Sequence, residues 1–259
     1  MNDLHITLVQ SDLHWEDPEA NLAMFGEKLS RLPEQTDLVV LPEMFPTGFS
    51  LHPQKLAQAM DGPVVRWMQE KARGLGAVIT GSLIIREEGR YYNRLIWAVP
   101  DGTLGTYDKR HLFSPGREDG EFTRGNKRLI ARLRGWKICL NICYDLRFPA
   151  WTSNQAGSEF DLLLYAASWP GKRNLAWNTL LQARAIENQC FVAGVNRVGT
   201  DPSGEVYDGD SSLIGPTGEI LRRVSGKEAV IPCTLSWKEL ASLRESFPFL
   251  RDGDQVMLA

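Results

Sequence analysis

Short apolar segments alternate with amphipathic helix patterns along this chain, and the alternation restricts the folds that it can adopt. Residues 38–41 are Leu-Val-Val-Leu, a continuous apolar run typical of a strand covered on both faces. Helix patterns begin at Asp17-Pro18 and at Gly62-Pro63, each with a proline at the first helical position. Further strands are predicted at residues 4–9, 77–85, 136–142, 161–166 and 191–195, with a helix at 174–189. Strands that alternate with helices predict a layered α/β protein.

Other strands follow one another without a helix between them. Turn signals at Glu88-Gly89 and Pro100-Asp101-Gly102 flank a strand at 92–99, and a strand at 104–107 follows. Later in the chain, strands are predicted at 212–214, 220–224 and 229–235, and a helix from 236 to about 247. Adjacent strands of this kind pair antiparallel, so the sheet must be mixed.

Two helix patterns show an apolar stripe. The first has Leu22, Phe25, Leu29 and Leu32 on one face. The second should end at Gly76, with inward positions at Val64, Val65, Met68, Ala72 and Leu75. Both helices are therefore expected to cover a sheet.

The composition is that of an ordinary globular protein. The 259 residues include 29 Lys and Arg against 32 Asp and Glu, a net charge of −3, which excludes a strongly basic nucleic-acid binder. With 43% hydrophobic residues a sizeable core can form, and no Ser/Gly/Pro-rich tract interrupts the interior, so residues 1–259 are interpreted as one domain. No apolar run approaches the roughly 20 residues of a membrane span. The N-terminal segment has an acidic residue and a histidine where a signal peptide would be basic, so a cytoplasmic location is expected.

The cysteines and histidines do not form a metal or disulfide pattern. Cys139 and Cys143 lie within or next to one predicted strand, where four residues span ~13 Å, too far for a disulfide. The four histidines are scattered, and no pair has the spacing of metal ligands. We expect no metal and no cofactor.

Reactive side chains follow three of the predicted strands. Glu43 follows residues 38–41, Lys109 follows 104–107, and Cys143 follows 138–142; Glu118 lies nine residues beyond Lys109. Each has an ordinary explanation: a core cysteine, a lysine in a solvated turn, and a glutamate that caps a helix. Together, at strand ends where open-sheet sites form, they supply a base, a cation for an oxyanion and a nucleophile. This combination predicts a thiol hydrolase.

Three segments around these residues resemble the signature segments of the nitrilase superfamily of carbon–nitrogen hydrolases. They are Leu41-Pro42-Glu43-Met44-Phe45, Tyr107-Asp108-Lys109-Arg110-His111-Leu112-Phe113 and Ile142-Cys143-Tyr144-Asp145-Leu146-Arg147-Phe148-Pro149. Supporting segments are Gly81-Ser82, Tyr92-Asn93-Arg94, Arg184-Ala185-Ile186-Glu187-Asn188-Gln189 and Gly215-Pro216-Thr217-Gly218-Glu219, so the resemblance covers nearly the whole chain. Within the superfamily, the cysteine segment through Trp151 and Ala167-Ser168-Trp169-Pro170 look most like the bacterial omega-amidases.

The resemblance implies a fold, an assembly and a catalytic set. The fold would be a four-layer α-β-β-α sandwich with mixed sheets, associating through one face into homodimers or homotetramers. The catalytic Glu, Lys and Cys of the superfamily fall on Glu43, Lys109 and Cys143. A second active-site Glu would be Glu118, although the nearby Glu121 is an alternative.

The expected reaction is hydrolysis of the terminal amide of 2-oxo acids such as 2-oxoglutaramate and 2-oxosuccinamate. Glu43 would act as general base, and Lys109 and the backbone N–H of Tyr144 would bind the oxyanion. Alternatives are another amidase or N-carbamoyl hydrolase of the superfamily, for instance one acting on deaminated glutathione, or a catalytically silent binding module.

Three residues are candidates for substrate binding. Arg147 could anchor a carboxylate, or it could pair with Asp145 and stiffen the loop. Trp169 could form a pocket wall, or it could be a core or interface residue, and Arg173 is a further candidate.

Overall fold

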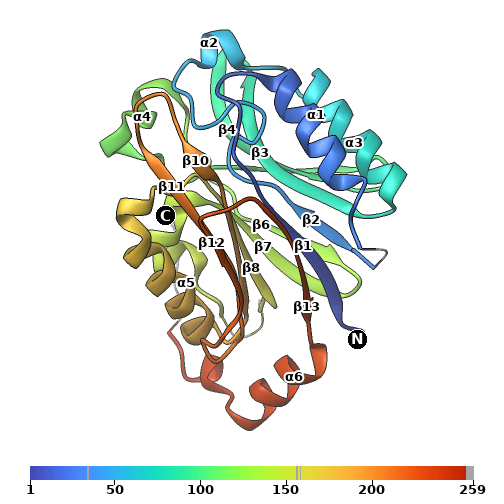
Figure 1. The fold of residues 1–259 in the computed structure, drawn as a ribbon. Coiled ribbons are helices and arrows are strands. Elements are labelled where there is room, and N and C mark those ends of the chain that lie inside the picture. Colours follow the sequence, from blue (N-terminus) through green and yellow to red (C-terminus); the bar gives the residue numbers. More distant parts are fainter. Residues whose placement is uncertain (34, 156, 158, 255–259) are drawn as a thin grey trace.

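Two mixed β-sheets packed face to face form the centre of the computed structural model (Figure 1). The structure describes residues 1–33, 35–155, 157 and 159–254. The first sheet has the strand order β13 (Ala229–Leu235), β1 (Leu4–Gln10), β2 (Leu38–Val40), β3 (Val78–Glu87), β4 (Arg90–Ala98) and β5 (Leu104–Asp108). Strands β1, β2 and β3 are parallel, and the remaining pairs are antiparallel.

The second sheet repeats this plan. Its order is β10 (Val198–Thr200), β11 (Val206–Ile214), β9 (Phe191–Asn196), β8 (Leu162–Ala167), β7 (Trp136–Ile142) and β6 (Leu129–Leu133), with β12 (Ile220–Ser225) paired to β11. Strands β7, β8 and β9 are parallel, and antiparallel strands flank them. Both sheets are therefore mixed, as the turn signals predicted.

Helices cover the outer face of each sheet. Helices α1 (Pro18–Leu29) and α3 (Pro63–Leu75) lie side by side on the first sheet, and α5 (Asn174–Asn188) lies on the second (Figure 1). The shorter helices are α2 (Pro53–Leu56), α4 (Glu118–Glu121) and α6 (Trp237–Ser246). The molecule is thus a four-layer α-β-β-α sandwich.

Neighbouring residues of β2 explain why this strand is apolar throughout. Leu38 and Val40 lie in the core that contains residues of both sheets, whereas Val39 lies in the core between the first sheet and α1 and α3. Successive side chains of a strand point to opposite faces, so a strand between two cores needs apolar residues at every position.

The predicted elements match the structure closely, but several differ or were missed, among them the short elements β10, α2 and α4. Helix α1 ends at Leu29 and does not reach Leu32, and Leu75 at the end of α3 is exposed. Strand β6 was not predicted, because polar and apolar residues share this edge strand and only Ala131 is buried. Strand β11 begins at Val206, six residues before the predicted start. Its first part was missed because Asp208, Gly209 and Asp210 are not residues typical of a strand.

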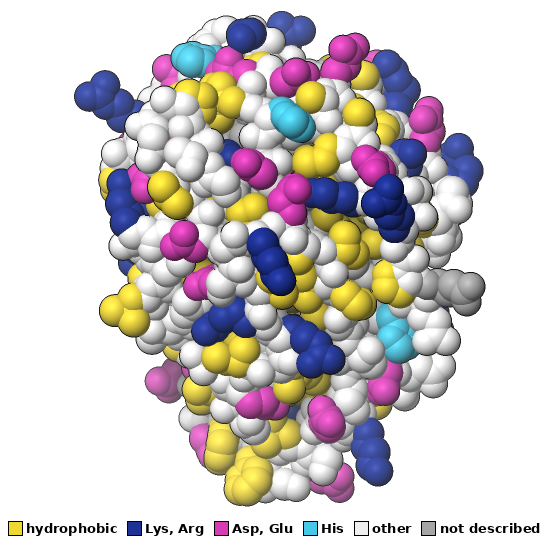
Figure 2. Space-filling model, in the orientation of Figure 1, with side chains coloured by type: hydrophobic (Ala, Val, Ile, Leu, Met, Phe, Trp, Pro, Cys, Tyr) yellow, Lys and Arg dark blue, Asp and Glu magenta, His cyan; other side chains and the backbone are white. Residues whose placement is uncertain are grey.

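No helix within the described ranges is long and apolar enough to cross a membrane. On the face shown in Figure 2, side chains of both charges are interspersed with hydrophobic ones.

Candidate active site

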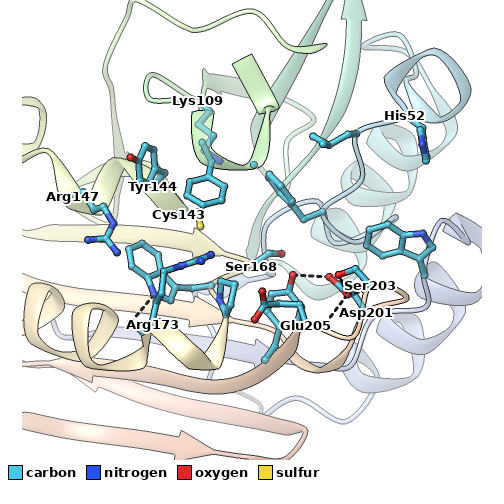
Figure 3. A pocket seen from close by; sticks show the side chains of 18 residues that line it. His52, Lys109, Cys143, Tyr144, Arg147, Ser168, Arg173, Asp201, Ser203 and Glu205 are labelled. Carbon is cyan, nitrogen blue, oxygen red and sulfur yellow. Dashed lines mark hydrogen bonds between the residues drawn. The ribbon is translucent and has the colours of Figure 1, made fainter. Parts of the chain in front are cut away.

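The candidate site lies where strand ends of the two sheets meet (Figure 3). Glu43 and Lys109 follow β2 and β5 of the first sheet, and Cys143 and Ser168 follow β7 and β8 of the second. The backbone N–H of Ser168 donates to Glu43 Oε2 at 2.8 Å, and the Ser168 hydroxyl donates to the Glu43 carbonyl at 3.2 Å. These hydrogen bonds join the Glu43 loop to the second sheet.

Cys143 occupies a sharp turn between β7 and a 3-10 helix, Cys143–Arg147. Its φ of +43° lies in the left-handed region, which an L-residue adopts at a cost of about 1 to 3 kcal/mol. Strained turns of this kind raise a nucleophile above the end of a strand, as in other hydrolase folds. The backbone N–H of Tyr144 lies in the first turn of the 3-10 helix, where an N–H has no partner within the helix.

Lys109 lies between two carboxylates, and all three side chains are completely buried. Its ammonium is 2.7 Å from Glu43 Oε1 and 2.8 Å from Glu118 Oε2. The Asn93 amide also donates to both acids, at 2.9 Å to Glu43 and 3.0 Å to Glu118. Lysine and asparagine together hold two like charges that would otherwise repel each other.

Glu118, rather than Glu121, is the second glutamate at this site. Its Oε2 also accepts the backbone N–H of Phe113 at 2.6 Å. Glu121 is exposed and accepts from Gln54 Nε2 at 2.9 Å. The two residues lie in the same short helix α4, and only the first of them points inward.

Burial and charge shift the proton affinities of these groups. Burial raises the pKa of the Cys143 thiol well above its ordinary value and the Glu43 charge raises it further, while the Lys109 charge opposes both. Burial alone would lower the pKa of Lys109, but the charges of Glu118 and Glu43 outweigh it and raise that pKa. Burial also raises the pKa of Glu118, against the effect of Lys109. The lysine is therefore a fixed cation, and the resting thiol is protonated.

A cavity of about 400 Å³ opens onto Cys143 and Lys109. Figure 3 shows Arg147 and Arg173 on one side of Cys143, and Asp201, Ser203 and Glu205 on the other. No described carboxylate forms an ion pair with either arginine.

Both guanidinium groups instead lie over aromatic rings. Arg147 Cζ is 4.9 Å from the ring centroid of Trp169, and Arg173 Cζ is 5.0 Å from that of Phe113. Trp169 is only 3% exposed but lines the cavity. An aromatic surface beneath a guanidinium orients its N–H groups without neutralising its charge, which leaves it free for an anionic ligand.

The alternative pairing of Arg147 with Asp145 is wrong. Asp145 is completely buried and accepts its hydrogen bonds from Ile142, Tyr107 and His111. Arg147 is turned toward the cavity, two residues further along the 3-10 helix.

Sequence reasoning gave no role to Asn93 and Ser168. Both lie in segments that carried the family resemblance, but their contacts with Glu43 depend on strands that are distant in the sequence. The described residues contain no group of three or more His, Cys, Asp or Glu that could hold a metal ion.

The four-layer fold, with a thiol and an ammonium lining one cavity and a carboxylate bound to the ammonium, is the arrangement expected of a hydrolase with a thiol nucleophile. Comparison with known proteins agrees: the chain belongs to the carbon-nitrogen hydrolase family, whose model matches residues 5–245, and is a hydrolase of carbon–nitrogen bonds.

Relatives extend over the full length of the chain. It is 44% identical over 259 residues to omega-amidase YafV of Escherichia coli, with 100% of both proteins covered. It is 32% identical to 2-oxoglutaramate amidase of Bacillus subtilis, covering 95% of this chain and 96% of that protein. The crystal structure of XC1258 from Xanthomonas campestris, a CN-hydrolase superfamily protein with an arsenic adduct in the active site, has a TM-score of 0.98 at 46% identity, with both chains covered completely.

Proposed function

We propose that this protein is an omega-amidase that hydrolyses the terminal amide of 2-oxo acids to the dicarboxylate and ammonia. The observation that carries the proposal is a cavity lined by Cys143 and Lys109, with Glu43 bound to Lys109. Two arginines on one side of the cavity form no ion pair with a described carboxylate. The reactive groups suit an amide, and the arginines suit the carboxylate at the other end of a short substrate. Similarity to omega-amidase YafV and to 2-oxoglutaramate amidase supports this substrate class.

In the first half of the reaction, Glu43 accepts the proton of Cys143 as the sulfur attacks the amide carbon. The pKa of the thiol is raised, so proton removal has to accompany the attack. The negative charge that develops on the amide oxygen is stabilised by the Lys109 ammonium and the backbone N–H of Tyr144. Protonation of the nitrogen by Glu43 then breaks the C–N bond, releasing ammonia and leaving a thioester.

In the second half, Glu43 activates a water molecule that attacks the thioester. The carboxylic acid is released and Cys143 regains its proton. Glu118 and Asn93 hold Lys109 and Glu43 in place through the hydrogen bonds described above, so the same groups serve both halves.

The test is ammonia release from 2-oxoglutaramate by the wild type and by Cys143→Ala, with glutamine and a simple aliphatic amide as comparison substrates. We expect release that depends on Cys143 and is selective for the oxo acid. Full activity of Cys143→Ala would contradict the catalytic role. If the protein releases carbon dioxide from N-carbamoyl compounds but no ammonia from 2-oxoglutaramate, it is an N-carbamoyl hydrolase instead.

We also propose that the protein is a homo-oligomer in the cytoplasm. Leu175 and Ile186 are exposed on α5 eleven residues apart, which places them on one face of the helix. The four cysteines are buried free thiols, which suits a reducing compartment. Light scattering coupled to gel filtration would measure the assembly, and a monomer at micromolar concentration would exclude it.

A further inference from the structure

Asp145 is a buried carboxylate for which the proposed reaction provides no role. It lies two residues after Cys143, is completely buried, and forms no ion pair with a described lysine or arginine. Its Oδ2 accepts from the Tyr107 hydroxyl at 2.7 Å and from the backbone N–H of Ile142 at 2.9 Å. Its Oδ1 lies 3.0 Å from the backbone N–H and 2.8 Å from Nδ1 of His111.

The partners of Asp145 flank two of the catalytic residues. Ile142 immediately precedes Cys143 at the end of β7 in the second sheet. Tyr107 lies in β5 of the first sheet, two residues before Lys109, and His111 lies two residues after Lys109. One carboxylate therefore connects the turn that carries the thiol to the turn that carries the ammonium.

Tyr107 extends this connection. Its hydroxyl donates to Asp145 and also accepts from Trp151 Nε1 at 3.0 Å and from the backbone N–H of Arg110 at 3.3 Å. The hydroxyl donates one hydrogen bond and accepts two, so these three partners fix its orientation. Tyr107 and Arg110 hold the chain on either side of Lys109.

A carboxylate suits this position because the Tyr107 hydroxyl and two backbone N–H groups donate to it, and His111 Nδ1 is a fourth donor in the Nδ1–H tautomer. An ionised Asp has two oxygens and only accepts, so it can satisfy all four donor groups. Asparagine would turn an NH2 group toward two of them, and a buried unsatisfied donor is costly.

We propose that Asp145 is a positioning residue that fixes the Lys109 ammonium relative to the Cys143 thiol. The inference rests on the proposed function, in which Lys109 stabilises the oxyanion formed by attack of Cys143. The two groups come from different sheets, and Asp145 accepts a direct hydrogen bond from each of the two turns. A displacement of about 1 Å in such a site costs about 10²-fold in rate.

Tyr107→Phe tests the proposal because it removes the Tyr107 hydrogen bond on the Lys109 side of the connection and the two that the hydroxyl accepts from Trp151 and Arg110. The hydrogen bond from Ile142 and the contacts with His111 stay in place. We expect kcat for 2-oxoglutaramate to fall about 10- to 100-fold, with KM within about twofold of the wild type. Alkylation of Cys143 by iodoacetamide should slow far less than kcat falls, because that displacement develops no oxyanion and Lys109 affects it only through the pKa of the thiol. Asp145→Asn should lose more kcat than Tyr107→Phe, since it disturbs both sides.

The matched control is Tyr165→Phe. Tyr165 is a completely buried tyrosine of β8 in the second sheet, and its hydroxyl forms no hydrogen bond with Asp145, so this variant loses the same group at a position outside the proposed connection. It should keep kcat, KM and the alkylation rate. Wild-type kcat in Tyr107→Phe would overturn the proposal, as would equal losses of kcat in Tyr107→Phe and Tyr165→Phe.

Failure of the proposed substrate is distinguishable from failure of the positioning role. A wild type that releases no ammonia from 2-oxoglutaramate contradicts the substrate alone. The same variants are then compared with the amide that the wild type does hydrolyse, because the oxyanion forms with any amide. If Asp145→Asn does not fold, Tyr107→Phe and its control still decide the question.

Discussion

The state of the Cys143 thiol depends on two charges of opposite sign. Burial raises its pKa first and the Glu43 carboxylate raises it further, while Lys109 lowers it. Glu43→Gln removes one of the two raising causes and leaves the lysine, so the thiol pKa should fall.

For Glu43→Gln we therefore expect the midpoint of the pH dependence of Cys143 alkylation to move to lower pH. Amide turnover should fall by at least about 10²-fold, because the general base is lost. Iodoacetamide labelling followed by mass spectrometry measures the midpoint, with Cys143→Ala as the blank. A midpoint at higher pH would mean that Glu43 does not act on the thiol through its charge.

Recognition of the substrate is also decided by single residues. Arg147 and Arg173 have aromatic partners but no described acidic partner, so Arg147→Met and Arg173→Met should weaken binding of an anionic substrate. We expect KM for 2-oxoglutaramate to rise about 10- to 100-fold, the range of a hydrogen bond to a charged group. KM for a simple aliphatic amide should not change. A variant that affects both substrates equally would assign its arginine to packing rather than recognition.

At the scale of elements, the end of α3 depends on backbone conformation alone. Gly76 has a φ of +65°, and a Cβ added there would meet no atom within 4 Å, so only its left-handed backbone favours glycine. Gly74 lies in the same helix, with equally open surroundings and no positive φ.

We therefore expect opposite effects from the same substitution two residues apart. Gly76→Ala should lower the free energy of unfolding by about 1 kcal/mol, and Gly74→Ala should raise it by about 0.5 to 1 kcal/mol. Urea denaturation measures both. Equal effects of the two variants would show that φ at Gly76 does not control the helix end.

At the scale of the whole molecule, the site requires that the two sheets remain packed. Leu8 of β1 is completely buried in the core that contains residues of both sheets. Leu8→Ala should cost about 2 to 5 kcal/mol, the usual range for a buried leucine. Activity and tryptophan fluorescence should be lost at the same urea concentration, because neither sheet carries the complete site. Loss of activity well before the fluorescence change would indicate that the sheets separate first.

Much of this protein could be predicted from the sequence, because the relevant signals are local. The apolar run at 136–142 gave the bounds of β7, and Asp17-Pro18 and Gly62-Pro63 gave the starts of α1 and α3. The motifs around Glu43, Lys109 and Cys143 identified the family, since each motif is contiguous. Edge strand β6 was missed, because an edge strand buries too few residues to leave a clear pattern.

The tertiary structure alone decided how these segments combine. Glu118 rather than Glu121 contacts Lys109, because only Glu118 points toward Lys109 from α4. Arg147 does not pair with Asp145, because Asp145 accepts hydrogen bonds from donors in β5 and β7. The local sequence does not predict either outcome, since Asp145 and Tyr107 lie 38 residues apart and Glu121 and Gln54 lie 67 residues apart. A sequence determines which groups a chain carries and which segments are apolar, whereas hydrogen bonds between distant segments form only when two sheets bring them within about 3 Å.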